Sequence, residues 1–235
     1  MPRQSPQHKA RLAGLLYLIV IVTAFFAEMF VRSSLVLDHD PAATARNIMA
    51  SQTLYRLGGA ADLINLLSDI ALAVILYELF KPFDRTVALS AAALRLVADA
   101  CLIGATFFHF APLYFLSGEP YLRPLGTDQL QVLALEAIKL HDLGYNICLV
   151  FFGVHCLLLG YLIARSGLVP RLIGVFFVAT GLCYLVNSFG HLVFPGINLP
   201  FYLLLTGLLS ETALMLWLLI FGVNVSRWFK AVDSQ

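Results

Sequence analysis

The chain alternates between long apolar runs and short polar breaks. Most of the runs reach the roughly 20 residues that an α-helix needs to cross the hydrocarbon core of a membrane. The pattern predicts six membrane-spanning helices, at residues 12–31, 55–79, 86–116, 141–164, 172–193 and 201–225. The third run is longer than a perpendicular crossing requires, so we expect it to tilt, to kink near Pro112 or to protrude.

Two further segments have helical patterns. Asp40 followed by Pro41 is typical of a helix cap and first helical residue, so we expect a helix through residues 42–49 that lies on the outer membrane surface. Thr127 and Asp128 open a second stretch with apolar residues at helical spacing. We expect this stretch to lead straight into the fourth span.

Composition supports a membrane protein. The chain is 60% hydrophobic and 12% charged, whereas soluble domains are about 45–50% apolar and about 25% charged. This excludes a soluble enzyme, a secreted disulfide scaffold, a disordered chain and a coiled coil. The net charge of +1 gives no sign of a nucleic-acid partner, and the four cysteines are expected to be isolated, buried thiols. We therefore predict an all-α, polytopic six-helix bundle that forms a single domain, residues 1–235, with the lipid bilayer as its surroundings.

Basic residues predict the orientation of the bundle. Six spans place both termini on one side of the membrane. Nine of the 15 Lys and Arg residues fall on that side, five fall on the other, and Arg95 lies within a span. The excess of cytoplasmic basic residues in membrane proteins predicts that both termini are cytoplasmic.

Several short stretches of sequence resemble a family of multi-pass bacterial membrane proteins that is classified as a domain of unknown function. They are ARLAGLLY (residues 10–17), VRSSL (31–35), FFGVH (151–155), GYLIARSG (160–167) and GLCYLVNS (181–188). The resemblance extends over nearly the whole chain. It implies an inner-membrane location and no known activity.

Ionisable side chains within the spans are the candidate functional residues, because hydrocarbon tolerates them only when they face the bundle interior and find partners. Counted from Phe83 in the turn between the second and third spans, Asp69, Arg95 and Asp99 lie at one depth. We expect them to form an ion network. It could fix helix register, or serve as a proton relay or ligand site. Asp62 continues the polar face of the second helix outward.

A second polar layer is expected nearer the outer surface. Asp142 and Asn146 on the fourth span lie level with His191 and Asn187 on the fifth. The residues expected to join or lie near this layer are Tyr184, His109, His141, Asp62 and Glu211. Histidine with carboxylates permits acid–base chemistry or metal binding. The alternative is that these groups only form hydrogen bonds and ion pairs with one another and hold the bundle together.

Two histidines of the fourth span raise the question of haem. His141 and His155 share nearly one helix face about 21 Å apart, a separation that suits two stacked haems. His155 has no histidine partner at its own level, which argues against two haems. One outer haem, with His109 and His191 as partners, is left open; otherwise His155 is expected to make a hydrogen-bonded contact between helices.

Glycines recur at seven-residue steps on the fourth and fifth spans: Gly153, Gly160, Gly174 and Gly181. Small residues at such steps let two membrane helices approach closely. We expect these glycines to pack the two spans together without a functional role.

The sequence thus predicts an outward-facing polar pocket that binds or transports a small or lipid-like solute. Its expected binding residues are Asp62, Asp69, Arg95, Asp99, His109, His141, Asp142, Asn146, His155, Tyr184, Asn187, His191 and Glu211. One alternative is a membrane-embedded enzyme, metal-dependent or not, that uses the His and Asp layer. Another is a non-catalytic partner subunit. The catalytic residues, metal, cofactor and oligomeric state are not fixed by the sequence.

Overall fold

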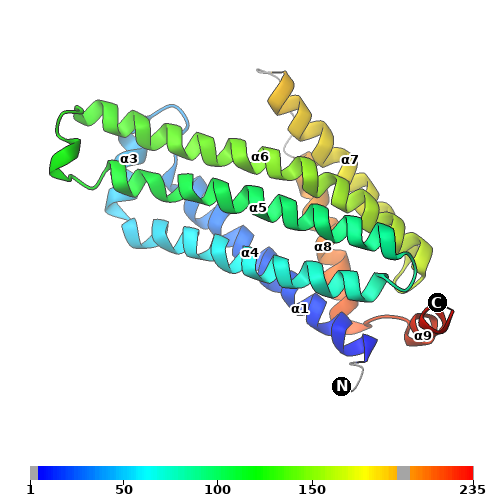
Figure 1. The fold of residues 1–235 in the computed structure, drawn as a ribbon. Helices are drawn as coiled ribbons and strands as arrows, with labels where there is room; N and C mark the ends of the chain where they lie inside the picture. The colour runs from blue at the N-terminus through cyan, green and yellow to red at the C-terminus, as the bar shows by residue number, and fades with distance from the viewer. Residues whose placement is uncertain (1–4, 195–201, 235) are drawn as a thin grey trace. The chain divides into compact units, whose positions relative to one another are not determined.

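The computed structural model describes residues 5–194 and 202–234, and all the regular structure in these ranges is helical (Figure 1). The prediction of an all-α fold is confirmed. The elements are α1 Pro6–Phe25, the π-helical segment η1 Phe26–Arg32, α2 Ser33–Leu35, α3 Pro41–Ala50, α4 Gln52–Phe80, α5 Arg85–Phe115, the 3₁₀ turn η2 Pro120–Leu122, α6 Thr127–Ser166, α7 Arg171–Val193, α8 Tyr202–Ile220 and α9 Val225–Asp233.

Among the described residues, five helical stretches are long and apolar enough to cross a membrane: Pro6–Leu35, Gln52–Phe80, Arg85–Phe115, Thr127–Ser166 and Arg171–Val193. The stretch Leu205–Ile220 with Val225–Asp233 qualifies as a sixth if the bent pair counts as one span. As predicted, the helix that begins at Thr127 continues without a break through the fourth apolar run. Pro112 lies inside α5.

The C-terminal helix differs from the prediction. The sixth span was expected to continue to residue 225, but α8 ends at Ile220 and the chain bends by 92° into α9. Gly222 has a φ of 72°, a backbone conformation that glycine adopts at low cost. The Asn224 side chain then caps α9 by accepting a hydrogen bond from Arg227 N. The sequence places a break between the fifth and sixth spans at residues 194–200. Of this segment only Phe194 is described, and residue 201 also lies outside the described residues.

The chain divides into two compact units. The single domain expected from the sequence, residues 1–235, stays a prediction. Unit 1 contains residues 1–21, 67–99 and 146–235, and unit 2 contains residues 22–66 and 100–145. Each unit has its own apolar cluster. The cluster of unit 1 is built around residues such as Tyr17, Leu72 and Phe177, and that of unit 2 around Ile48, Tyr55 and Ile138.

Close backbone contact joins α6 to α7 within unit 1. A Cβ atom added to Gly160 would lie 2.6 Å from Gly174 O, and one added to Gly181 would lie 2.6 Å from Gly153 O. The four glycines that the sequence indicated as a packing surface therefore face one another in pairs. Such contact lets two helices approach more closely than side chains would allow.

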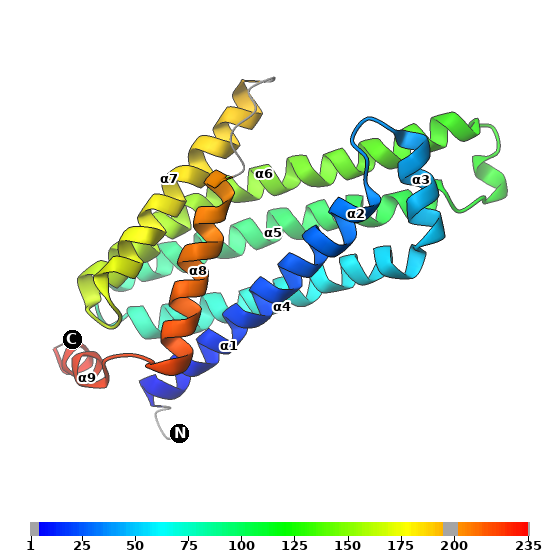
Figure 2. The same ribbon diagram turned by 180° about the vertical axis from the view of Figure 1, so that it is seen from behind.

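Helix α8 packs against the first helix in the same unit (Figure 2). Gln7 joins them, since its Nε2 donates to Phe221 O at 2.9 Å and its Oε1 accepts from Val223 N at 3.1 Å. Further along, a Cβ on Gly14 would lie 2.8 Å from Leu219 Cγ. The beginning of α1 and the end of α8 are thus held together.

The cap of α3 gives a first prediction. Asp40 Oδ1 accepts a hydrogen bond from Ala43 N at 2.8 Å, as the Asp-Pro sequence indicated. Replacing an N-cap of this kind by alanine costs about 0.5–2 kcal/mol, because one helical N–H loses its acceptor. We expect Asp40→Ala to lower the free energy of unfolding, measured by denaturant titration in detergent, by this amount. Asp38→Ala is the matched control on an exposed neighbour; equal losses in the two variants would contradict the assignment.

Candidate functional site

A buried arginine organises the polar groups of unit 1. Arg95 of α5 is 0% exposed, and its guanidinium forms a bidentate pair with Asp69 of α4, with Nε donating to Oδ2 at 2.8 Å. Nη1 donates to the Tyr17 hydroxyl of α1 at 3.2 Å. The guanidinium also lies 5.2 Å from the ring centroid of Tyr17 and 5.1 Å from that of Phe152, within the range of cation–π attraction. The ion pair expected from helix depth is therefore present.

His155 of α6 completes the shell around Arg95. Arginine can only donate, so the 3.0 Å contact from Arg95 Nη1 makes His155 Nε2 the acceptor. Its Nδ1 therefore carries the proton and donates to Ala91 O at 2.8 Å. Both ring nitrogens are engaged, so neither is free to bind haem iron. The observed role is the helix–helix contact that the sequence left as the alternative.

Two more carboxyl groups belong to the Arg95 network. Asp99, one turn along α5 from Arg95, is buried and interacts electrostatically with Asp69 and Arg95. Its Oδ2 has no hydrogen-bond partner among the described residues. Glu211 of α8 interacts electrostatically with Arg95 and Asp69. The sequence grouped Glu211 with the outer layer, whereas the structure places it with Arg95 because α8 packs within unit 1.

The outer layer is only partly assembled as expected. Asn187 Nδ2 of α7 donates to Asn146 Oδ1 of α6 at 3.3 Å, so the two amides meet. His191 lies in the last turn of α7 and is exposed, contrary to the expectation that it faces the interior. Asp142 is exposed too and belongs to unit 2, so its pairing with His191 stays a prediction. Tyr184 is buried in unit 1 with its ring centroid 6.1 Å from that of Phe152.

Unit 2 contains a second buried cluster, formed by Tyr55 of α4, His109 of α5 and His141 of α6, which are 0%, 2% and 3% exposed. The rings of Tyr55 and His109 stack with centroids 4.4 Å apart, and His141 lies 5.9 Å from His109. His109 Nε2 donates to Tyr55 O at 3.1 Å. Gly59 makes this approach possible, because a Cβ there would lie 2.8 Å from His109 Cδ2.

Three atoms of the Tyr55–His109–His141 cluster stand out. Tyr55 Oη and both ring nitrogens of His141 are buried and have no hydrogen-bond partner within residues 5–194 and 202–234. Asp142 Oδ1 lies 3.6 Å from His141 Nδ1, which is beyond hydrogen-bonding distance. Buried polar atoms nearly always have a partner in folded proteins. Tyr55 and His141 are therefore the residues of unit 2 at which a bound molecule would gain hydrogen bonds.

An ion pair lies in the same unit. Arg32 Nη1 donates to Asp62 Oδ2 at 2.7 Å, and Arg32 Nε donates to Glu28 Oε2 at 2.7 Å. Glu28 and Arg32 belong to the π-helical segment Phe26–Arg32. Such segments are rare in proteins, and those that occur often lie at functional sites. Asp62 was expected to extend the Asp69 face; its observed partner is instead Arg32.

The sequence missed four residues of these clusters: Tyr17, Phe152, Arg32 and Tyr55. Tyrosine and phenylalanine are ordinary apolar-face residues in a membrane helix, and Arg32 looked like a charge at the end of a span. The available signal was the presence of Arg95 and Asp62, since an intramembrane charge requires partners. Which helix supplies the partner could not be read from the sequence.

Metal binding has no support from the described side chains. In residues 5–194 and 202–234, no group of three or more His, Cys, Asp or Glu side chains is arranged to hold a metal ion. The polar layer therefore gives no support to the metal-dependent form of the enzyme alternative.

These features define a class: an all-helical, multi-pass membrane protein with buried polar clusters. The chain belongs to the family described as Domain of unknown function (DUF4386), whose model matches residues 12–222. It is 26% identical over 180 residues to an uncharacterized protein of Archaeoglobus fulgidus, in a match that covers 74% of this chain and 88% of that protein. No solved structure matches. The resemblance to a family of unknown function is thus confirmed.

Proposed function

We propose that this chain is a bacterial inner-membrane protein, with both termini cytoplasmic, that binds or transports a small or lipid-like solute in an outward-facing polar pocket. The observation that carries the proposal is the set of unpartnered buried atoms on Tyr55 and His141 in unit 2. An unpaired buried polar group costs about 1–3 kcal/mol. A solute that offers hydrogen bonds would remove this cost.

The cluster also suggests the chemistry of the solute. A tyrosine hydroxyl both donates and accepts, and a neutral imidazole offers one donor and one acceptor. The charge of Arg32 is already balanced by Asp62 and Glu28, so this cation is not available to select an anion. An uncharged molecule with hydroxyl or carbonyl groups, seated against the rings of Tyr55 and His109, fits these properties.

The Arg95 network of unit 1 has the charge composition of a proton-exchange site. One cation faces three carboxyl groups, and among the described residues only Asp69 forms an ion pair with it. Ionisable groups inside membranes are costly and commonly mark proton or ion pathways. Two carboxyl groups held close together commonly share one proton, as in acid dyads. Asp99 and Glu211 are therefore the proposed proton contacts.

Access of water-soluble reagents to the cluster tests the proposal without knowledge of the solute. His141→Cys and Ile138→Cys occupy the same helix, and both parent side chains are buried, at 3% and 4% exposure. A charged, membrane-impermeant thiol reagent is added to intact cells that express each variant. If a polar pocket opens outward, we expect His141→Cys to react at least about tenfold faster than Ile138→Cys. The reagent reacts with the thiolate, and a buried thiol ionises and meets the reagent only where water has access.

Wild-type chain, with its four native cysteines, supplies the background rate, and Tyr55→Cys repeats the test from another helix. Melting in detergent shows that the variants are folded. If folded His141→Cys and Tyr55→Cys are as inert as Ile138→Cys, the cluster is dry and closed. The pocket proposal is then wrong, and the polar groups serve only assembly, as in the partner-subunit alternative.

A further inference from the structure

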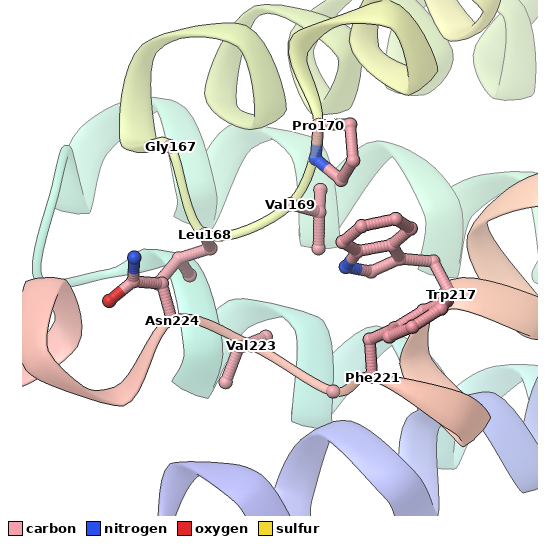
Figure 3. Close-up of a pocket in the computed structure, with 9 residues that line it drawn as sticks. Gly167, Leu168, Val169, Pro170, Trp217, Phe221, Val223 and Asn224 are labelled. Atoms are coloured by element: carbon pink, nitrogen blue, oxygen red, sulfur yellow. The ribbon is translucent and has the colours of Figure 1, made fainter.

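A pocket of about 390 Å³ lies in unit 1, at the end of the helices where α1 begins. It is lined by residues 167–170 of the α6–α7 loop, residues 221–224 of the α8–α9 link, and Trp217. Figure 3 shows the rings of Trp217 and Phe221 close together at one end, with Leu168 and Asn224 at the other. Asn224 N donates to Leu168 O at 3.0 Å, so the two walls are joined.

Three exposed cations belong to the helices that border this pocket. Arg171 begins α7, and Arg227 lies over Gly167, where an added Cβ would overlap its guanidinium. Lys230 follows Arg227 one turn later on α9. None of the three forms an ion pair with any residue that the structure describes. Asp233 ends the same helix, which leaves the group with a net positive charge.

The surroundings are those of a membrane interface. Both tryptophans of the chain are here, and tryptophan is enriched at the boundary between membrane and water. Trp228 of α9 is buried and donates from Nε1 to Leu79 O at 3.1 Å, which fixes α9 to the end of α4. Because α9 turns by 92° from the apolar α8, it lies along the membrane surface if α8 crosses the membrane.

We propose that this pocket binds the headgroup of an anionic phospholipid. Its volume falls within the range of about 300–1,000 Å³ that is usual for ligand sites and is enough for a headgroup. The phosphate would meet Arg171, Arg227 and Lys230, and the start of the acyl chains would contact Trp217 and Phe221. A zwitterionic lipid brings its own cation beside the phosphate and so balances none of the net positive charge, whereas basic pockets between membrane helices are suited to anionic headgroups.

Tryptophan fluorescence gives a direct test, because both tryptophans report on this region. The full chain is reconstituted in phosphatidylcholine vesicles with a rising fraction of phosphatidylglycerol that carries brominated acyl chains, which quench nearby indoles. We expect a saturable quenching component at low fractions of this lipid, and none with brominated phosphatidylcholine. In R227Q/K230Q the half-saturating fraction should rise about 25-fold, because each of the two basic residues removed contributes about fivefold near an anionic headgroup.

The control R46Q/R123Q removes the same charge from exposed positions of unit 2, and its half-saturation should stay within about twofold of wild type. Equal effects of the two double variants, or saturable quenching by brominated phosphatidylcholine, would overturn the proposal. Inorganic phosphate at millimolar concentration is expected to leave the quenching unchanged. If phosphate relieves it as well as unlabelled phosphatidylglycerol does, the site recognises a free anion and the lipid assignment fails.

Discussion

Arg95→Met is expected to be the most destabilising single substitution proposed for this protein, with a loss of about 3–5 kcal/mol in the free energy of unfolding. The change leaves the Asp69 carboxylate buried without its cation, and it removes the donor to Tyr17 and His155. Denaturant titration of purified protein in detergent micelles, followed by circular dichroism, measures the loss.

Lys139→Met is the matched control, because Lys139 pairs with Glu136 while both side chains are about half exposed. Exposed pairs contribute about 0–1 kcal/mol, so this variant should be nearly as stable as wild type. The double variant R95M/D69L should recover much of the loss, since it leaves no unpaired charge of the Arg95–Asp69 pair. If Arg95→Met loses no more free energy of unfolding than Lys139→Met, the Arg95 network does not stabilise unit 1.

Gly160→Ala is expected to cost about 1–3 kcal/mol, the usual range for an atom forced into a packed site. The new Cβ would lie 2.6 Å from Gly174 O and 2.9 Å from Val178 N, and both are backbone atoms that cannot rotate away. Helices α6 and α7 must then separate. Gly174→Ala meets Gly160 O at 2.7 Å, so it should have a similar effect. The double variant should cost less than the sum, because one separation relieves both clashes.

Gly104→Ala is the matched control within helix α5, where a Cβ would meet nothing within 4 Å. There alanine should be neutral or should stabilise by up to about 1 kcal/mol, since it restricts the unfolded chain and favours the helix. Thermal unfolding in detergent compares the three single variants. A Gly160→Ala protein that melts at or above the temperature of Gly104→Ala would show that α6 and α7 are not in close backbone contact.

Several parts of the fold and of the candidate sites could be predicted from the sequence. The all-helical membrane class followed from apolar runs, and the α3 cap followed from Asp40 and Pro41. The Asp69–Arg95 pair followed from counting residues outward from a tight turn, because antiparallel helices rise equally per residue. The same counting brought Asn146 and Asn187 together.

Other contacts depend on how each helix is rotated about its axis, which depth alone does not give. Arg32 meets Asp62, and Tyr55 stacks on His109, because particular faces of separate helices pack against each other. The bend into α9 was missed because the apolar run continues past Ile220, and hydropathy does not register the turn at Gly222.

By itself, the sequence determined that this chain forms apolar helices, how deep each polar residue lies along its helix, and that glycines would line two adjacent helices. These properties depend on local composition and on the fixed rise of the α-helix. The tertiary structure decided which partner each buried polar group has: Asp69, Tyr17 and His155 for Arg95, and no described partner for His141. The physical reason is that partner choice depends on helix rotation, which is set by the packing of many side chains from distant parts of the chain.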